Sequence, residues 1–278
     1  MHTVCCLKQV PDTAQVKIDP ETNTLVRAGV ESILNPFDLV ALELAVRLKD
    51  QHGGKVTAVT MGPPQAASVL RQALSLGADE AILLSDRAFA GADTLATSYT
   101  LAMAIKKMDK ETPVDLVICG KQAVDGDTAQ TGPGIATRLK FAQLTYVSEV
   151  HRVDPEKRTI QVTRQVDGGV EVALGKLPAL LTVELELARP RRASLPLLIA
   201  SLNAPISTWD AEAIGALKSM VGIKGSPTWV RRISSPAPRK GGPKFRAETD
   251  PEKAVDGVLQ TLSADGDFFS KLASKVEA

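Results

Sequence analysis

Apolar and polar positions alternate in blocks over the first two-thirds of the chain. Short runs of apolar or β-branched residues predict buried strands at residues 3–7, 56–61, 81–84 and 114–119. Between them, apolar residues recur at helical spacing and predict amphipathic helices that begin at Pro36, after Pro64 and near Asp93. Strands that alternate with such helices predict βαβ units built around a parallel sheet.

The pattern changes to period two near Tyr146. Two β-rich segments precede the turns at residues 154–157 and 167–169 and predict hairpins, because Asp-Gly-Gly tolerates the positive φ of tight turns. A further strand is predicted at residues 179–187, and a surface loop is expected to begin at Arg189.

These patterns predict an α/β fold with an open, mostly parallel sheet flanked by helices, of the nucleotide-binding, Rossmann-like kind, with an added β-hairpin region. Residues 1–200 are expected to form this domain. Residues 201–278 are expected to form a linker and an extended C-terminal arm, because from Met220 onward the Pro- and Gly-containing stretches at 225–227 and 234–243 cannot build a compact core. A short amphipathic helix is predicted at residues 251–262. A proline-rich tether that ends in a helix indicates docking on a partner chain.

Composition narrows the function. The 278 residues are 44% hydrophobic and carry a formal net charge of +1, which suits a buried core and gives no support for a nucleic-acid partner. No apolar run approaches the roughly 20 residues of a membrane span, so no membrane insertion is expected. The three cysteines, Cys5, Cys6 and Cys119, form no CxxC pair, so a reducing cytoplasm and buried thiols are expected.

Sequence motifs for self-contained catalysis are absent. The chain has no GxxxxGK[ST], GxGxxG, HExxH or GxSxG motif, and its three histidines stand singly along the sequence. No metal site and no catalytic constellation are therefore expected.

The stretch at residues 119–134 is the richest of the chain in Gly, Asp, Thr and Gln, and it follows a predicted strand. Loops at the carboxyl ends of parallel strands line the crevice in which ligands bind. The amides that open the next helix suit a phosphate, which Gly132 and Gly134 would let approach closely. Asp125 and Asp127 would repel a phosphate and are expected to hold loop amides or a ribose or ribityl hydroxyl. An ordinary polar loop explains the segment equally well.

Two further segments are expected at the same edge of the sheet. Asn35 is a good N-cap for the helix that starts at Pro36, and this structural role is the preferred interpretation when the segment is taken alone. Met61 ends a strand and could line one side of an adenine pocket, although an apolar methionine more often belongs to a core.

Five motifs occur together in an order and spacing that point to one family. They are KQVPD at 8–12, Asn-Pro-Phe-Asp followed by ALELA within 35–45, LGAD at 76–79, the Gly-Lys-Gln to Gln-Thr-Gly run at 120–132, and Asp-Gly-Gly at 167–169. From about residue 3 to the C-terminus, the chain resembles the electron-transfer flavoprotein β subunit.

The resemblance implies a heterodimer with an α subunit that carries FAD, and a β subunit that holds an adenine nucleotide. Leu195, in an Ala-Ser-Leu-Pro segment, matches the leucine that anchors an acyl-CoA dehydrogenase-type partner, and an exposed leucine next to proline suits a preformed anchor. The family's nucleotide-contacting positions fall on Cys6, Asn35, Pro36, Phe37, Asp38, Met61, Gly120, Lys121, Gln122, Ala123, Val124, Asp125, Gly126, Asp127, Thr128, Ala129, Gln130 and Thr131.

The resemblance also bears on which nucleotide is held. Ordinary members hold AMP, whereas in the electron-bifurcating branch the same pocket holds a second FAD that takes a hydride from NADH. Gly126 resembles the bifurcating branch, because many AMP-holding members have an acidic residue there, while Thr131 resembles the AMP branch. We expect FAD. One electron would then pass to a low-potential acceptor such as ferredoxin or flavodoxin and one to the α-subunit FAD, with no general base required.

Three alternatives stay open at this point. The chain could be a plain electron-carrier subunit that holds AMP, an assembly subunit with an empty pocket, or a stand-alone ATP-binding α/β protein. The last would need a phosphate loop such as SGGxDS after the first strand, and residues 8–12 do not provide one.

Overall fold

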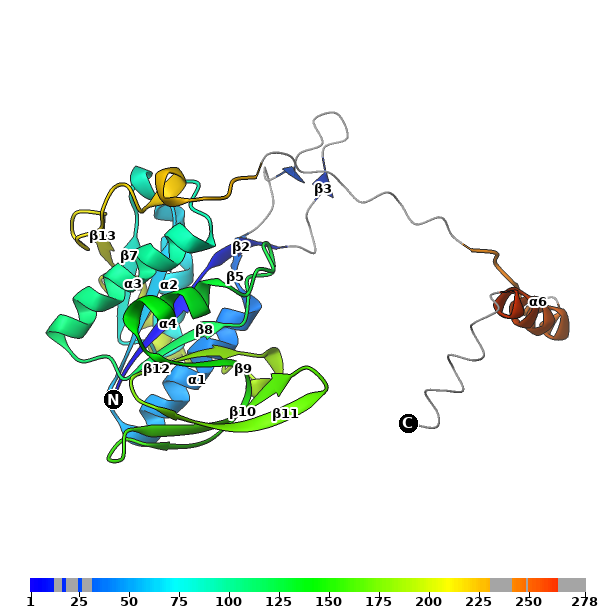
Figure 1. The fold of residues 1–278 in the computed structure, drawn as a ribbon, viewed down its shortest axis with the longest axis horizontal. Helices are drawn as coiled ribbons and strands as arrows, with labels where there is room; N and C mark the ends of the chain where they lie inside the picture. Colours follow the sequence, from blue (N-terminus) through cyan, green and yellow to red (C-terminus); the bar gives the residue numbers. More distant parts are fainter. Residues whose placement is uncertain (13–16, 19–24, 27–31, 231–241, 249, 265–278) are drawn as a thin grey trace. The chain divides into compact units, whose positions relative to one another are not determined.

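The computed structural model describes residues 1–12, 17–18, 25–26, 32–230, 242–248 and 250–264 (Figure 1). The chain divides into two compact units, Met1–Ser234 and Ser235–Ala278. The prediction of residues 231–241 as part of a tether lies outside the described residues. In the described part of the chain, no helix is long and apolar enough to cross a membrane.

A nine-stranded sheet forms the centre of the first unit. Its order is β11-β10-β9-β12-β8-β1-β6-β7-β13, and all neighbours from β9 to β13 run parallel. The parallel strands are β1 (His2–Leu7), β6 (Lys55–Met61), β7 (Glu80–Leu84), β8 (Leu116–Gly120), β12 (Ala179–Val183) and β13 (Ser207–Trp209).

The hairpin region extends the sheet at one end. β9 (Ala142–Asp154), β10 (Thr159–Val166) and β11 (Gly169–Lys176) pair antiparallel through turns after residues 154 and 166. Two small ladders lie outside this sheet, β2 (Gln9–Pro11) with β5 (Ser32–Leu34) and β3 (Lys17–Ile18) with β4 (Leu25–Val26). The predicted fold class, an open and mostly parallel sheet flanked by helices with an added hairpin region, is therefore confirmed.

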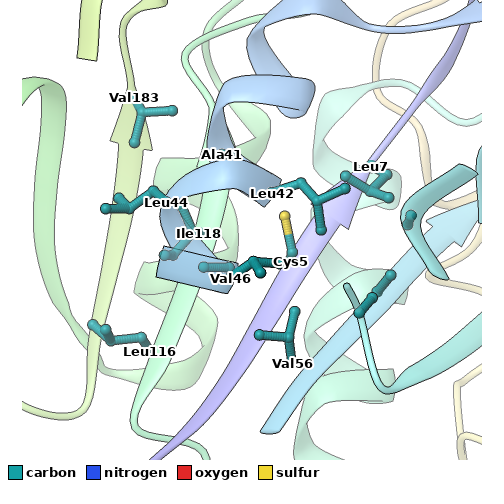
Figure 2. Packing of buried hydrophobic residues seen from close by; sticks show 14 of the residues in the cluster. Cys5, Leu7, Ala41, Leu42, Leu44, Val46, Val56, Leu116, Ile118 and Val183 are labelled. Atoms are coloured by element: carbon teal, nitrogen blue, oxygen red, sulfur yellow. The ribbon is translucent and has the colours of Figure 1, made fainter. Parts of the chain in front are cut away.

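Helices cover both faces of the sheet, so the central strands are buried on both sides. Leu116 and Ile118 of β8 pack into one apolar cluster with α1 (Pro36–His52) and α2 (Ala67–Ser75) (Figure 2). Val117 and Cys119 point to the other cluster, with α3 (Thr94–Glu111) and α4 (Thr131–Leu139). The three cysteines are free and buried, as the sequence predicted.

The order of the strands creates a crevice at one edge of the sheet. From β1 the chain proceeds to β6 and β7 on one side, then returns through α3 to β8 on the other side of β1. The helix that follows β1 and the helix that follows β8 lie on opposite faces of the sheet, so the two connections diverge where the strand order reverses. The crevice that this leaves outside the carboxyl ends of the strands is the usual ligand site of such sheets.

The region after residue 183 differs from expectation. The strand predicted at 179–187 ends at Val183 and is followed by a 3₁₀ turn, η4 (Leu185–Leu187). The expected surface loop at Arg189 leads after six residues into a helix, α5 (Leu195–Asn203), because Ser194 accepts a capping bond from the Leu197 N–H and Pro196 suits a first turn.

Part of the segment expected to be linker belongs to the main unit. β13 pairs with β7 in the large sheet. Val221 is buried beside η5 (Gly222–Gly225), so a segment that the sequence predicted could not build a core contributes to one. In the second unit, α6 (Pro251–Ser263) confirms the predicted helix at 251–262, and Asp250 caps it.

Replacing Ile118 by alanine should lower the free energy of unfolding by about 2–5 kcal/mol, because its side chain is fully buried between β8 and α1. Urea unfolding of the purified protein measures this change. Leu217→Ala, at a position 60% exposed, is the matched control and should change stability by no more than about 0.5 kcal/mol. Equal effects of the two substitutions would contradict the packing described.

Candidate functional site

The first turn of α1 fastens the glycine-rich loop. Asn35 lies at the N-cap position, but its side chain does not cap the helix. Its Nδ2 donates to the carbonyl of Gln122 at 2.9 Å, and its Oδ1 accepts from the Val124 N–H at 3.2 Å. The predicted capping bond is therefore wrong. The amide is fully buried and matches one donor and one acceptor of the loop, which sets the path of the backbone there.

Asp38 ties the ends of β1 and β8 to the same helix. Its two carboxylate oxygens accept from the backbone N–H groups of Lys8, at 2.8 Å, and Gly120, at 3.1 Å. A Cβ at Gly120 would lie 2.5 Å from Asp38 Oδ1, so only glycine permits this approach. Burial raises the pKa of Asp38 to about 7, although hydrogen bonds from Asn35, Lys8 and Gly120 act in the opposite direction.

The two carboxylates of the loop bind side chains within the protein. Lys8 Nζ binds both oxygens of Asp125, at 2.7 and 2.8 Å, and Gln122 Nε2 donates to Asp127 at 2.9 Å. These partners are not loop amides, and the other expected partner, a ribose or ribityl hydroxyl, stays a prediction. Because Lys8 offsets the charge of Asp125, that carboxylate repels a nearby anion less than it would alone.

The exposed part of the loop holds an uncommon backbone. Asp127 and Ala129 have φ of 49° and 52°, in the left-handed region that residues other than glycine seldom adopt. Gly126, between Asp125 and Asp127, does not have positive φ, and a Cβ there would meet no atom within 4 Å. Two left-handed non-glycine residues so close together are typical of a segment whose shape serves a ligand.

The amino end of α4 follows directly. The helix begins at Thr131, and no side chain of the described residues caps it. Unpaired N–H groups at a helix start attract anions. Gly132 and Gly134 have a packing role, because a Cβ would meet Thr182 Cγ2 at 2.5 Å and Ser98 Oγ at 2.7 Å, while the approach of a phosphate to their backbone stays a prediction. The two glycines let α4 pack closely on β12 and α3.

Lys121 points away from the exposed part of the loop. Its Nζ binds both carboxylate oxygens of the buried Glu184 at 3.0 Å and lies 5.8 and 5.5 Å from the ring centres of Phe37 and Tyr146. This arrangement satisfies the lysine inside the protein. Lys121 and Phe37 therefore stabilise the base of the loop.

A cavity of about 710 Å³ opens beside the ends of β6 and β7. Its lining is mostly apolar and consists of Met61, Gly62, Pro63, Pro64, Ser85, Asp86, Arg87, Phe89, Ala90, Gly91 and Ala92. Thr94, which starts α3 just after this lining, donates from its hydroxyl to Gln130 Oε1 at 3.2 Å. Cavities of about 300–1,000 Å³ with few polar groups are typical of cofactor sites.

Cys6 and Cys119 lie side by side on β1 and β8, beneath the crevice. Their Cα atoms are register partners, and both side chains belong to the apolar cluster on the α3 and α4 face. The hydrogen bond with Cys6, together with burial, holds the pKa of Cys119 well above its usual range. Cys119 thus stays protonated, and the two neighbouring cysteine side chains form the floor of the site.

The structure brings most of the predicted residues together. Asn35, Asp38 and the loop at 120–131 are joined by hydrogen bonds, Pro36 and Phe37 lie in the same first turn, and Met61 lies at the neighbouring cavity. Leu195 does not belong to this cluster, since it begins α5. Sequence reasoning assigned no role in the site to Lys8, Thr94, Glu184 or the segment at 85–92, because their spacing from the loop carries no local signal.

The chain is similar to known proteins over nearly its whole length. A family model, the electron transfer flavoprotein domain, matches residues 22–214. Protein FixA of Azotobacter vinelandii is 49% identical over 265 residues, which cover 94% of each chain. Subunit CarD of the caffeyl-CoA reductase-Etf complex of Acetobacterium woodii is 49% identical over 263 residues, 94% of this chain and 98% of that one. Electron transfer flavoprotein subunit beta of Megasphaera elsdenii is 45% identical over 269 residues, 95% and 98% of the two chains.

These similarities agree with the five sequence motifs and with the nucleotide-binding type of sheet. The family implies an α subunit as partner and a role in a redox complex. The chain belongs to the electron transfer flavoprotein family and is a β subunit within it.

Proposed function

We propose that this β subunit binds FAD at the carboxyl ends of β1, β6 and β8 and takes part in NADH-dependent electron bifurcation with its α subunit. The proposal rests on the loop at 121–130. Asn35 binds the backbone of this loop, and the loop ends at the uncapped start of α4. The uncapped amides suit a pyrophosphate, and the exposed loop residues suit a ribityl or ribose chain.

Two features favour FAD over AMP. The cavity beside Met61 lies at the same edge of the sheet and offers apolar walls for a second planar ring system. Gly126 leaves open space where a side chain would stand, so the approach to the loop is wider and carries one charge fewer than an acidic residue would give. AMP, which needs only the loop and one ring pocket, is the alternative.

The side chains of this site position a nucleotide and do not perform acid–base chemistry. When bound, FAD would accept a hydride equivalent from NADH and release electrons singly, to the α-subunit FAD and to a low-potential acceptor such as ferredoxin or flavodoxin. Asn35 and Asp38 keep the loop in shape, and Cys6 and Cys119 keep water from the floor of the site. Lys8 and Gln122 fix the positions of the Asp125 and Asp127 carboxylates.

We also propose α5 as the docking element for an acyl-CoA dehydrogenase-type flavoenzyme. Leu195 is 67% exposed, and its neighbours Leu198 and Leu202 are exposed on the same short helix. Arg71 donates to the carbonyls of Ser201 and Ala204 at the end of α5, which fixes the helix on α2. The name of the CarD relative, a subunit of a caffeyl-CoA reductase complex, supports a partner of this class.

The C-terminal unit would complete the heterodimer as an arm that docks on the α subunit. Its helix α6 exposes Val255, Val258 and Leu259, an apolar face typical of a docking helix.

Denaturing the purified heterodimer should release two FAD and no AMP per αβ pair, as quantified by chromatography. One FAD and one AMP would exclude bifurcation and favour the electron-carrier alternative.

In the Gln130→Ala, Thr131→Ala double variant the β-site nucleotide should be lost while the α-subunit FAD remains, because the substitutions change the turn that opens α4. One FAD and no AMP in both the unaltered heterodimer and the double variant would argue for an assembly subunit with an empty pocket.

Asn35→Ala should weaken nucleotide binding by about tenfold or more, because it leaves the Gln122 carbonyl and the Val124 amide without their buried partner. Equilibrium dialysis of the nucleotide-depleted heterodimer gives the dissociation constant. Asn203→Ala, at an exposed residue that ends α5, is the matched control and should bind like the unaltered protein. Unchanged affinity in the Asn35 variant would show that the hydrogen bonds from Asn35 to Gln122 and Val124 do not support nucleotide binding.

Asp38 should make stability fall as pH rises from about 4 to about 7. Its pKa is raised on folding, so between the ordinary value near 3.8 and about 7 the folded state binds more protons than the unfolded state, and raising the pH favours unfolding. The melting temperature of the unaltered protein should therefore decline relative to Asp38→Asn over this range. Parallel pH profiles for the two proteins would contradict this behaviour.

A further inference from the structure

The outer strand of the hairpin region presents an apolar stripe to solvent. Val170, Val172 and Leu174 are 66%, 60% and 72% exposed and alternate along β11, so they lie on one face of the sheet. The intervening Ala173 and Gly175 face the opposite way, toward the core around Ile160. Scattered exposed apolar residues are ordinary, but three consecutive same-face positions on one strand form a patch.

The neighbouring strand extends this patch without adding charge. Val170, Val172 and Leu174 pair across β10 with Gln165, Thr163 and Gln161, all neutral. On this face, charged residues lie at the border of the patch: Lys176 ends β11, and on β9 Arg152 pairs with Asp154 while His151 lies 3.6 Å from Glu149. Protein interfaces typically have an uncharged core and a polar rim. The centre of this patch and its charged border have the same composition.

The free edge of β11 has none of the usual protection. The strand is eight residues long, contains no proline and keeps a regular register with β10 along its whole length. In the described part of the chain, no strand pairs with its other edge. Its one ion pair, from Glu171 to Arg164, runs inward to β10 and leaves the edge itself unguarded. Exposed, regular and apolar edges of this kind invite pairing with another chain.

We propose that the outer face and free edge of β11, with Val172 at the centre, form a contact surface for the α subunit of the heterodimer. The α subunit is the permanent partner that family membership implies, and a permanently exposed apolar edge needs a permanent cover. The dehydrogenase-type partner, which must come and go, has α5 as its own separate apolar surface. The proposal rests on the heterodimer and not on the identity of the nucleotide.

The test compares two exposed positions in the full-length chain co-expressed with its α subunit. Val172→Asp should weaken the heterodimer at least tenfold, equivalent to about 1.4 kcal/mol, because it places a charge at the centre of an apolar contact. Leu202→Asp on α5 is the matched control at 63% exposure and should leave the dissociation constant unchanged. Sedimentation of the labelled subunits gives both constants, and circular dichroism confirms that the variants fold.

A second measurement keeps the result independent of the substitutions. Alternate amides of residues 169–176 already bond to β10, so hydrogen exchange is followed at the outward-pointing amides, which should be protected in the heterodimer and exchange readily in the β subunit alone. Protection of these outward-pointing amides in the β subunit alone would indicate that a second copy or the chain's own arm covers the edge, and would overturn the proposal. So would a Val172→Asp heterodimer as tight as the unaltered one. The dissociation constant and the hydrogen exchange both measure assembly of the heterodimer. A β subunit found to hold AMP in place of FAD would therefore not change either result.

Discussion

The site depends on one constraint: the first turn of α1 must lie close to the carboxyl end of β8. Gly120 has no Cβ, so the first turn of α1 can lie against the β8 backbone, and Asp38 can accept from both Lys8 and Gly120. Asn35, one turn earlier, then meets the loop backbone at two points. A larger residue at Gly120 would separate the helix from the strand and release all four hydrogen bonds together, which couples the shape of the loop to a single packing contact.

This constraint separates the parts of the site by role. The buried residues Asn35, Phe37 and Asp38, with the partly buried Lys121, hold the base of the loop, while the residues at 125–128 are exposed. The carboxylates nearest the expected ligand are already paired, so the amides at the start of α4 dominate the local potential. Polar groups fixed before binding cost little to organise when the ligand arrives.

The two proposed contact surfaces, α5 and β11, lie on elements that do not take part in this clamp. α5 is fixed through Arg71 at its end, and the loop that leads into it is fixed through Arg191, whose guanidinium binds the buried Glu43 at 2.9 Å. β11 is fixed by its ladder with β10. A partner on either surface meets a preformed face, and neither contact requires the nucleotide loop to move.

The sequence alone determined the order of the large sheet's strands and of its helices through residue 176, the fold class, the family and the loop that carries the candidate site, because periodicity and turn chemistry are local signals. It did not predict the small strands β2 to β5, the partners of the Asn35 side chain, the packing of Gly132 or the segment that became β13. In the last three cases the deciding partner lies far along the chain: Gln122 for Asn35, Thr182 for Gly132 and β7 for β13. Only the tertiary structure brings such groups together, because a buried amide or a missing Cβ acquires its role from whatever packs against it.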